Sequence, residues 1–323
     1  MQPPFIEFKK ITKIFGEKLI LSNINLGIPF GEIYGIIGKS GSGKTTILNV
    51  LIGYLKPESG QVLFQSRDID RDVESVRQQF GFAAQEGSFY RKLTVRENLK
   101  YFGILYNMDD KEIEAGIPSL LKLVDLGGTE DTLAIDLSSG MRKRLDIACA
   151  IIHNPKVLIL DEPTEDLDPM LRKEIYNVLK RINDKLKVTI ILTSHLLDEM
   201  EPLCSRIAII DNKSILASGT VDELKDLYSK NHEIHLETVS GKYSGIINEL
   251  KSKSAISSVK TSGHKVVIFT SKPEKTLKDV LGIIDKRGEK LMDVDVNRPS
   301  LNEVFESLTK KNVQANRDHK EKL

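Results

Sequence analysis

The chain has 323 residues, with 40% apolar and 29% charged side chains, which is room for about two domains and enough apolar material for a real core. These numbers indicate a soluble globular protein. Its 47 basic and 46 acidic residues leave a formal net charge of +1, which argues against a nucleic-acid partner because such proteins carry a basic surface.

Cysteine usage and hydropathy exclude two further classes. Cys149 and Cys204 are far apart without C-x-x-C spacing, so we expect two buried thiols in a reducing compartment and no disulfide or metal framework. The N-terminus lacks the pattern of a signal peptide. The longest apolar runs, residues 157–160 and 188–192, are far short of the ~20 residues that span a bilayer. We therefore expect a cytosolic protein that meets a membrane only through a partner.

Short apolar runs alternate with helical patterns over roughly the first 220 residues. Strands are expected at residues 6–8, 19–28, 33–37, 157–160, 188–192 and 207–210. Helices are expected at residues 46–55, 171–182 and 196–203, and within a more polar middle section, residues 86–145. Buried strands that alternate with helices predict an α/β fold with a parallel sheet.

The composition changes near residues 228–231, which predicts a linker between two domains. Beyond it the patterns follow the order β-α-β-β-α-β, which is the ferredoxin-like motif. We expect capping boxes at Ser271–Glu274 and at Ser300–Glu303, each before a helix. The sequence thus predicts domains at residues 1–228 and 229–310. The polar tail, residues 311–323, is expected to be disordered.

A phosphate-loop pattern lies between an expected strand and an expected helix. The residues expected to bind phosphate are Gly38, Lys39, Ser40, Gly41, Ser42, Gly43, Lys44, Thr45 and Thr46. In this pattern backbone N–H groups surround the phosphates, the lysine reaches the β and γ oxygens and the following hydroxyl ligates Mg²⁺. Lys44 and Thr45 take those two roles here.

A second acidic motif follows the apolar run at residues 157–160. A buried strand that ends in an acid places that acid at the carboxyl edge of the sheet, beside the phosphate loop. Asp161 is expected to hold the magnesium ion, usually through water, and Glu162 is the candidate general base for an attacking water. Asp-Glu after a strand is commonplace alone, so the prediction depends on the pairing with the phosphate loop.

Leu137-Ser138-Ser139-Gly140-Met141, upstream of that strand, resembles the signature sequence of ABC transporter ATPases. Together the motifs resemble this family over about residues 5–225. The resemblance implies an α/β P-loop NTPase fold, the ABC cassette. It has a parallel core sheet, an antiparallel β-subdomain and a helical subdomain at about residues 86–145. A small α+β ferredoxin-like domain would follow it.

The resemblance also implies roles for single residues. Gln85 looks like the glutamine of the glutamine loop, which touches both the metal and the lytic water, and His195 looks like the switch histidine, which donates to the γ-phosphate. Asp168 looks like the end of the D-loop. Phe15 matches the aromatic residue on which adenine stacks, although a lone phenylalanine is about as often a core residue. The implied cofactors are ATP and Mg²⁺.

Family members pair head to tail, so the resemblance implies a homo- or heterodimer with ATP at the interface. Ser138, Ser139 and Gly140 of one subunit would close over ATP held by the other. Ser139 stands where glycine is usual, and Glu165-Asp166 replaces a small polar residue and a glycine. These departures bear on dimer closure. One hypothesis is that Glu165 or Asp166 pairs with Lys39 of the second subunit.

Residues 297–305 (NRPSLNEVF) resemble the ending of ATPases from systems that export drugs, lipids or polysaccharides. The first hypothesis is therefore an ATPase subunit at the cytoplasmic face of the membrane, bound to a separate transmembrane permease. The alternative is an importer ATPase whose C-terminal domain senses a ligand. A non-transport ABC protein ranks third, because it would need two cassettes or a long coiled coil.

Overall fold

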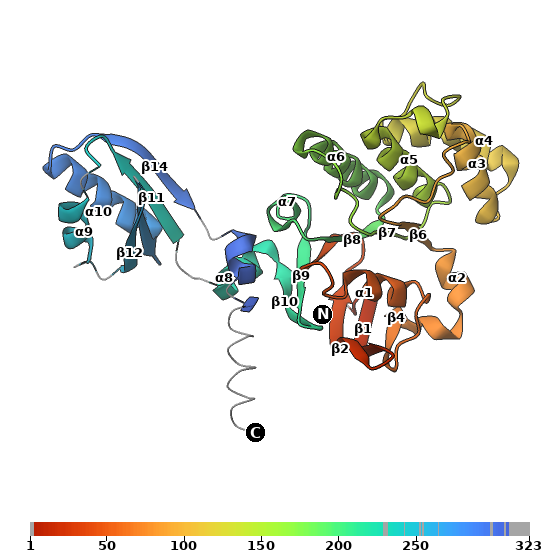
Figure 1. The fold of residues 1–323 in the computed structure, drawn as a ribbon, viewed down its shortest axis with the longest axis horizontal. Coiled ribbons are helices and arrows are strands. Elements are labelled where there is room, and N and C mark those ends of the chain that lie inside the picture. Colours follow the sequence, from red (N-terminus) through yellow and green to blue (C-terminus); the bar gives the residue numbers. More distant parts are fainter. Residues whose placement is uncertain are drawn as a thin grey trace. The chain divides into compact units, whose positions relative to one another are not determined.

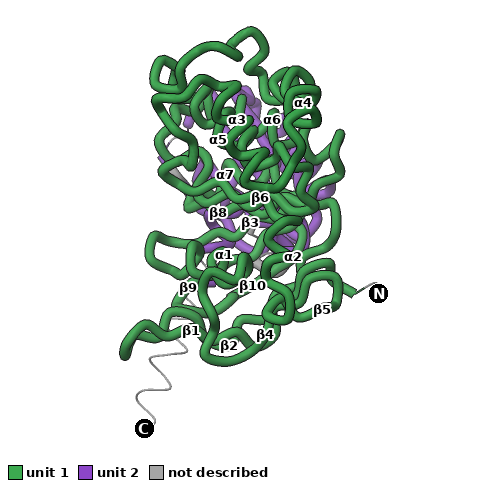
Figure 2. Tube along the Cα trace, turned by 90° about the vertical axis from the view of Figure 1, so that its right-hand side faces the viewer, with its two compact units in different colours: residues 1–220 green, residues 221–323 purple. Residues whose placement is uncertain are grey.

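The computed structural model describes residues 3–228, 232–241, 243–251, 253, 255–263, 265–297, 300–306 and 308–309. The chain divides into two compact units, residues 1–220 and 221–323 (Figure 1; Figure 2). The composition break near residues 228–231 lies further along the chain than this division, and residues 229–231 are outside the described part. No helix in the described ranges has both the length and the apolar character needed to cross a membrane.

The first unit contains a six-stranded sheet in the order β10-β9-β3-β8-β7-β6. Its strands are β3 (Ile33–Ile37), β6 (Phe80–Ala83), β7 (Val157–Leu160), β8 (Thr189–Ser194), β9 (Arg206–Asp211) and β10 (Ser214–Thr220). The first five are parallel, and β10 pairs antiparallel with β9. Every residue of β3, β7 and β8 is buried, as expected for strands covered on both faces. The predicted parallel sheet is confirmed.

An antiparallel sheet in the order β2-β1-β4-β5 completes the strands of this unit. Its members are β1 (Ile6–Phe15), β2 (Lys18–Ile28), β4 (Ser59–Phe64) and β5 (Arg67–Asp68). Buried and exposed positions alternate along β1, so one face packs inward. Helix α1 (Lys44–Leu51) shares a hydrophobic core with β1, β2 and β3, through residues such as Phe8, Leu21 and Leu48.

The helices α3, α4 and α5 gather at the end of this unit away from β1 and β2 (Figure 1). The helices of the first unit beyond α1 are α2 (Val73–Arg77), α3 (Val95–Leu105), α4 (Asp110–Leu123), α5 (Ser139–Ile151), α6 (Pro169–Leu186) and α7 (Leu197–Met200). Single 3-10 turns occur at Ile69–Arg71 and Ala134–Asp136. The α/β cassette with a parallel core sheet, an antiparallel sheet and a helical part is therefore observed.

The second unit has the predicted ferredoxin-like order. Its elements are α8 (Val221–Tyr228), β11 (His232–Thr238), α9 (Ser244–Lys251), β12 (Ile256–Ser262), β13 (Lys265–Thr270), α10 (Pro273–Lys286) and β14 (Leu291–Asn297). The strands form an antiparallel sheet in the order β12-β13-β11-β14. Apolar residues of β11 and β13 pack with those of α9 and α10 in one core, for example Ile234, Ile268 and Ile284.

One of the two predicted capping boxes is wrong. Helix α10 has Lys272 as its N-cap and no side-chain cap hydrogen bond, because Pro273 takes the first helical position, which proline favours. The second box is confirmed: Glu303 N–H donates to Ser300 Oγ at 3.3 Å, and Ser300 N–H donates to Glu303 Oε2 at 2.8 Å. Residues 301–306 follow as a helix. Residues 298–299 and the tail, 311–323, lie outside the described residues.

Candidate active site

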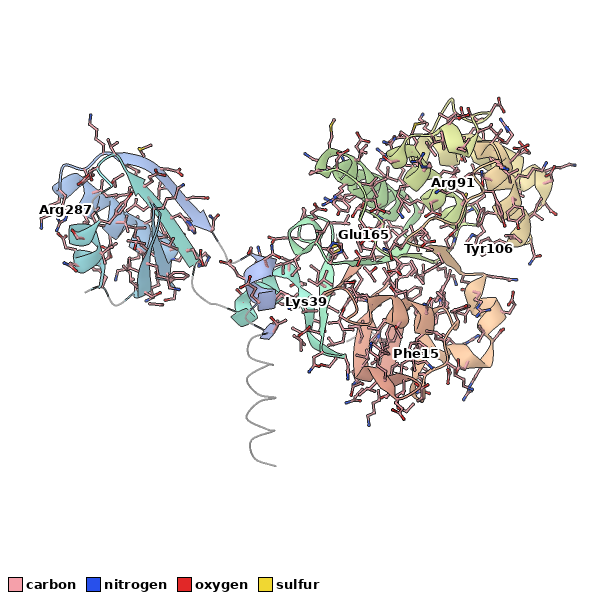
Figure 3. The ribbon with its side chains drawn as sticks, in the orientation of Figure 1. Phe15, Lys39, Arg91, Tyr106, Glu165 and Arg287 are labelled. Carbon is pink, nitrogen blue, oxygen red and sulfur yellow. The ribbon has the colours of Figure 1, made fainter. Side chains whose placement is uncertain are left out.

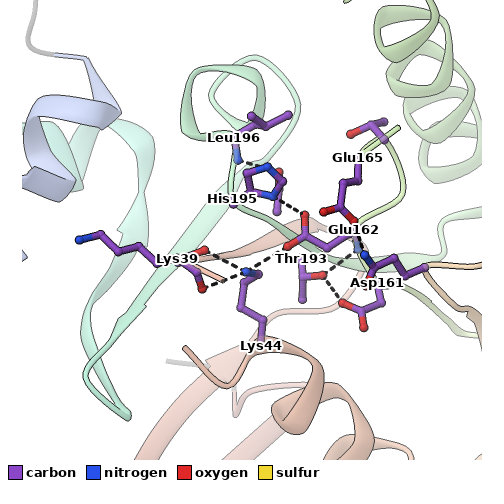
Figure 4. Close-up of polar contacts among 12 residues, drawn as sticks. Lys39, Lys44, Asp161, Glu162, Glu165, Thr193, His195 and Leu196 are labelled. Carbon is purple, nitrogen blue, oxygen red and sulfur yellow. Dashed lines mark hydrogen bonds and ion pairs between the residues drawn. The ribbon is translucent and has the colours of Figure 1, made fainter. Parts of the chain in front are cut away.

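Three motifs that are far apart in the sequence meet at the carboxyl ends of neighbouring strands. β3 lies between β9 and β8, and β8 lies between β3 and β7. β3 runs into the phosphate loop, β7 into Asp161 and Glu162, and β8 into His195. Figure 3 shows Lys39 and Glu165 at this edge, and Figure 4 shows the polar contacts among the three motifs. Topology therefore brings the phosphate loop, the paired acids and His195 to one edge of the sheet.

The phosphate loop needs glycine at defined positions. Gly41 and Gly43 have φ of +75° and +104°, which side chains rarely allow. A Cβ on Gly38 would lie 2.4 Å from Ile210 O, so the backbone there is too close for any side chain. The Ser42 hydroxyl is buried and has no hydrogen-bond partner within the described chain. An unsatisfied buried hydroxyl in a loop that opens a helix suits a phosphate oxygen.

Lys44 is held at the centre of the site. Its ammonium donates to Gly38 O at 2.9 Å and to Lys39 O at 3.3 Å, and it forms an ion pair with Glu162 Oε1 at 3.0 Å. The side chains of Lys44 and Glu162 are 6% and 10% exposed. Figure 4 shows the Lys39 side chain turned away from this cluster, so Lys39 contributes its backbone here. A nearly buried ammonium bonded to carbonyls is placed to bind an anion.

Glu162 has a fixed orientation. Its second oxygen, Oε2, lies 3.0 Å from His195 Nδ1. Its backbone N–H donates to Thr193 Oγ1 at 2.9 Å, and that hydroxyl donates to Asp161 Oδ1 at 2.6 Å. Thr193 therefore links the two acids, a role that the sequence did not reveal. Its position at the end of a buried strand, beside another strand that ends in acids, was the available signal.

Gln85 reaches the site from the neighbouring strand. It follows β6, which pairs with β7, and its side-chain Nε2 donates to Glu165 Oε2. Its carbonyl oxygen accepts from Lys143 Nζ of α5 at 3.3 Å. These residues line a pocket of about 170 Å³ together with Glu162. Glu165, which the sequence suggested as a partner of Lys39 in a second subunit, is thus bonded to Gln85 in its own chain.

The signature residues do not join the phosphate loop within one chain. Ser138 and Ser139 are exposed, and Ser138 Oγ caps α5 by accepting from Met141 N–H at 3.3 Å. Gly140 is buried, and a Cβ there would lie 3.1 Å from Leu171. The contacts described for Ser138 and Gly140 are with Met141 of α5 and with Leu171 of α6. Their predicted role toward ATP stays a prediction that concerns a second subunit.

Two further predicted residues have plain local environments. Asp168 is the N-cap of α6, and its Oδ1 accepts from Met170 N–H at 2.9 Å and Leu171 N–H at 3.0 Å. Phe15 ends β1, is 46% exposed and is not part of the buried core cluster of this unit. The Lys13 ammonium lies 5.2 Å from the centre of the Phe15 ring. The exposed ring offers a flat apolar surface, as a stacking residue requires.

Asp146 of α5 lines the same pocket and is fully buried, with 0% of its side chain exposed. Its Oδ1 accepts from Ser88 N–H at 2.7 Å, and the Lys143 ammonium is 3.9 Å from Oδ2. Burial raises the pKa of Asp146 from 3.8 to about 6. Between those pH values the folded chain holds a proton that the unfolded chain has lost. The contribution of Asp146 to the free energy of unfolding therefore falls as pH rises from about 4 to 6.

Asp146→Asn should remove this dependence while keeping an oxygen for Ser88 N–H. Relative to the parent, we expect the variant to gain stability as pH rises from 4 to 7, by up to about 3 kcal/mol. Denaturant unfolding at several pH values measures the difference. The same change at the exposed Asp184 of α6 is the control for net charge. A difference between Asp146→Asn and parent that is constant across this range would contradict the prediction.

The site can be tested for its fit to magnesium by the side chains that the described residues offer as ligands. Among the described residues, no group of three or more His, Cys, Asp or Glu side chains could hold a metal ion. Thr45 supplies a hydroxyl in the phosphate loop, and Asp161 supplies a carboxylate next to Glu162, which pairs with Lys44. Gln85 supplies an amide and lines a pocket together with Glu162. Magnesium is usually held by one or two carboxylates together with substrate phosphates, so this donor set fits a nucleotide-bound ion.

Known proteins share both parts of the chain. Residues 21–165 match the family described as ABC transporter, and residues 219–309 match the family described as ATP-binding protein DrrA1-3-like, C-terminal domain. The Nod factor export ATP-binding protein I of Rhizobium sp. (strain N33) is 31% identical over 96% of this chain and 98% of its own length. The linearmycin resistance ATP-binding protein LnrL of Bacillus subtilis (strain 168) is 30% identical, over 94% and 98%.

A solved structure agrees with this assignment. CbiO1 of Clostridium perfringens, described as part of the ABC transporter complex cbiONQ, has a TM-score of 0.65 and 28% identity. The match covers 70% of this chain and 94% of that one. Most of this chain thus shares the fold of a subunit of an ABC transporter complex. The chain belongs to the ATP-binding proteins of ABC transporters and carries a DrrA-like C-terminal domain.

Proposed function

We propose that this ABC ATPase hydrolyses ATP in a magnesium-dependent reaction and so drives export through a separate membrane permease. The observation that carries the catalytic part is the position of Glu162, held between Lys44 and His195 at 3.0 Å from each. The phosphate loop thus ends beside a base, Glu162, a phosphate-binding cation, Lys44, and a second hydrogen-bond donor, His195. This is the set that in-line attack of water on a γ-phosphate requires.

The chain's residues would act in sequence around the bound nucleotide. The amides of Gly43–Thr45 and the Lys44 ammonium bind the phosphates, which compete with Glu162 for Lys44 and release that carboxylate toward the attacking water. Glu162 takes a proton from the water as the water oxygen bonds to the γ-phosphorus. The bond between the γ-phosphorus and the bridging β-phosphate oxygen breaks, and ADP leaves. His195 donates to a γ-phosphate oxygen.

A magnesium ion, held by Thr45, Asp161 and Gln85, would neutralise charge on the β- and γ-phosphates. Thr193 fixes the carboxylate of Asp161 by its 2.6 Å hydrogen bond, so that this acid need not reorganise when the ion binds. The unpartnered Ser42 hydroxyl supports a phosphate at the loop.

A second ATPase subunit would complete the site. Ser138 and Ser139 are exposed at the start of α5, where a helix N-terminus favours an anion. We infer a head-to-tail dimer, in which these residues and Gly140 meet ATP bound to the other subunit. Whether the second subunit is identical does not alter the chemistry.

Exposed apolar side chains of the helical part support a protein partner. They are Tyr90, Tyr101, Ile104, Leu105, Leu133 and Ile135, and each is 38% exposed or more. Tyr90 contacts Tyr101, and Ile135 N–H donates to Arg91 O at 2.9 Å, so the segments lie together. Such a patch favours a binding surface. We assign it to the permease, which would hold the chain at the cytoplasmic face of the membrane.

The export direction rests on relatives whose names include Nod factor export and linearmycin resistance. Importer ATPases with a ligand-sensing C-terminal domain are the alternative. The test is co-purification of the tagged chain with the membrane protein encoded beside it. We expect a permease of about six membrane spans that raises the ATPase rate. Co-purification of an extracytoplasmic substrate-binding protein would contradict export.

Phe15→Ala should weaken ATP binding without slowing the chemical step. Stacking of a base on an aromatic ring is worth about 1–3 kcal/mol, so we expect KM for ATP to rise about ten-fold and kcat to stay within about two-fold. Phe15→Trp should keep the parent KM. Phe30 is 59% exposed and precedes β3, at the opposite end of that strand from the phosphate loop, so Phe30→Ala is the matched control. Equal KM values for Phe15→Ala and parent would exclude stacking on Phe15.

A further inference from the structure

Gln85 is held at two points by charged side chains from different elements. Glu165, in the segment between β7 and α6, accepts a hydrogen bond from the Gln85 side chain. Lys143, on the helix that begins with the signature residues, donates to the Gln85 backbone carbonyl at 3.3 Å. The loop that follows is fixed to the same helix, because Ser88 N–H donates to Asp146 Oδ1 at 2.7 Å. The Gln85 loop is thus tied to both neighbouring segments.

The Glu165 contact selects one orientation of the Gln85 amide. An ionised carboxylate only accepts hydrogen bonds, so it binds the amide NH₂ and not the amide oxygen. The oxygen is then the free end of the amide. A metal ion or the polarised hydrogens of a water need that oxygen, whereas the NH₂ group would repel a cation. A serine or alanine at position 165 has a shorter side chain without a carboxylate, so it could not bind the Gln85 NH₂ group in this way.

Positive charge near Glu165 offsets the repulsion between its carboxylate and the other acids of the site. The Lys143 side chain, 14% exposed, experiences the negative charges of Asp146, Asp166, Asp161 and Glu165. The Lys143 ammonium thus reduces the mutual repulsion of several carboxylates that line or border the pocket, which Arg91 and Arg142 also line. Without it, an added acid beside Glu162 would be unfavourable by like-charge repulsion.

We propose that Glu165 is a positioning residue for Gln85, orienting its amide so that the oxygen faces the metal side of the site. The inference rests on the proposed function, because it assigns Gln85 to a nucleotide-bound magnesium ion. It also gives the unusual acid of this segment a role within its own chain. The dimer interface is not required for that role.

The test measures metal affinity in the absence of turnover. Mn²⁺ replaces magnesium, a non-hydrolysable ATP analogue fills the nucleotide site, and bound Mn²⁺ is measured by electron paramagnetic resonance. Glu165→Ala should weaken Mn²⁺ binding about five-fold, the equivalent of about 1 kcal/mol, with affinity for the analogue within about two-fold of parent. Asp166→Ala is the matched control, since Asp166 lines the same pocket without a hydrogen bond to Gln85 among the described contacts.

A double-mutant cycle separates positioning from a general effect of charge. Gln85→Ala should weaken Mn²⁺ binding by itself, and adding Glu165→Ala should then have no further effect. Additive losses, or a Glu165→Ala variant with parent affinity, would overturn the inference while leaving the proposed function intact. If the parent binds no Mn²⁺ in the presence of the analogue, the proposed function and the inference both fail.

Discussion

Glu162→Gln is expected to abolish steady-state ATP hydrolysis and to leave the ATP-bound dimer intact. The amide keeps the size of the side chain and can still contact Lys44 and His195, which lie 3.0 Å from the two Glu162 oxygens. It cannot accept the proton of the attacking water. Positioned general bases contribute about 10²–10⁴-fold to rate, so kcat should fall by at least about 100-fold. Phosphate release and sedimentation with ATP measure the two effects.

The trapped dimer distinguishes a lost base from a damaged site. If Glu162→Gln only disturbed nucleotide binding, the variant would sediment as a monomer in ATP. We expect a dimer in ATP and a monomer in ADP, because the γ-phosphate is what the signature loop of the second subunit meets. Asp184→Asn, which removes one charge at an exposed site on α6, is the control and should keep the parent kcat. Hydrolysis by Glu162→Gln at the parent rate would show that Glu162 is not the base.

Lys44→Ala should have two separable effects, on nucleotide binding and on stability. Loss of the ammonium that reaches the phosphates should weaken ATP binding by about 100-fold, a typical value for charge-assisted contacts. The change also leaves the Glu162 carboxylate, 10% exposed, without its cation 3.0 Å away. Removing one partner of a buried pair costs about 3–5 kcal/mol, and His195 should offset part of it. Lys180→Ala, at an exposed site on α6, is the control.

Adding Glu162→Gln to Lys44→Ala separates these effects. The double variant no longer buries an unpaired charge, so its unfolding midpoint in the absence of nucleotide should return toward the parent value. Its ATP affinity should stay low. A double variant as unstable as Lys44→Ala would show that the ion pair does not contribute to stability. Restored ATP affinity would show that Lys44 acts only by neutralising Glu162.

Local patterns predicted the parts of the site that lie within one segment. The phosphate loop could be recognised because it needs glycine at Gly41 and Gly43, where φ is positive, and a lysine at a fixed spacing. Its meeting with Asp161 followed from the rule that parallel strands share a carboxyl edge. The ferredoxin-like order was visible because strand and helix periodicities differ.

The contacts between distant segments could not be predicted. Gln85 and Glu165 are 80 residues apart, and Glu165 looked like a departure from the family pattern until its partner was visible. The Thr193 hydroxyl joins the Asp161 carboxylate to the Glu162 backbone across more than 30 residues of sequence, and no sequence pattern indicated this contact. Single-sequence patterns carry no information on such pairs, because either member is compatible with many surroundings.

Strand lengths and one cap were also missed, for local reasons. β1 was expected at residues 6–8 but runs from Ile6 to Phe15, since its pairing with β2 continues through register shifts that interrupt the alternation. At α10, the preference of Pro273 for the first helical position outweighed the Ser271–Glu274 pattern.

Magnesium-dependent binding of ATP at Lys44 is the central step of the proposed function. Calorimetric titration of the purified full chain with ATP, with and without Mg²⁺, measures it. We predict one site per chain that binds more tightly with Mg²⁺ and is lost in Lys44→Ala. ATP affinity that ignores both Mg²⁺ and the Lys44 substitution would contradict the account.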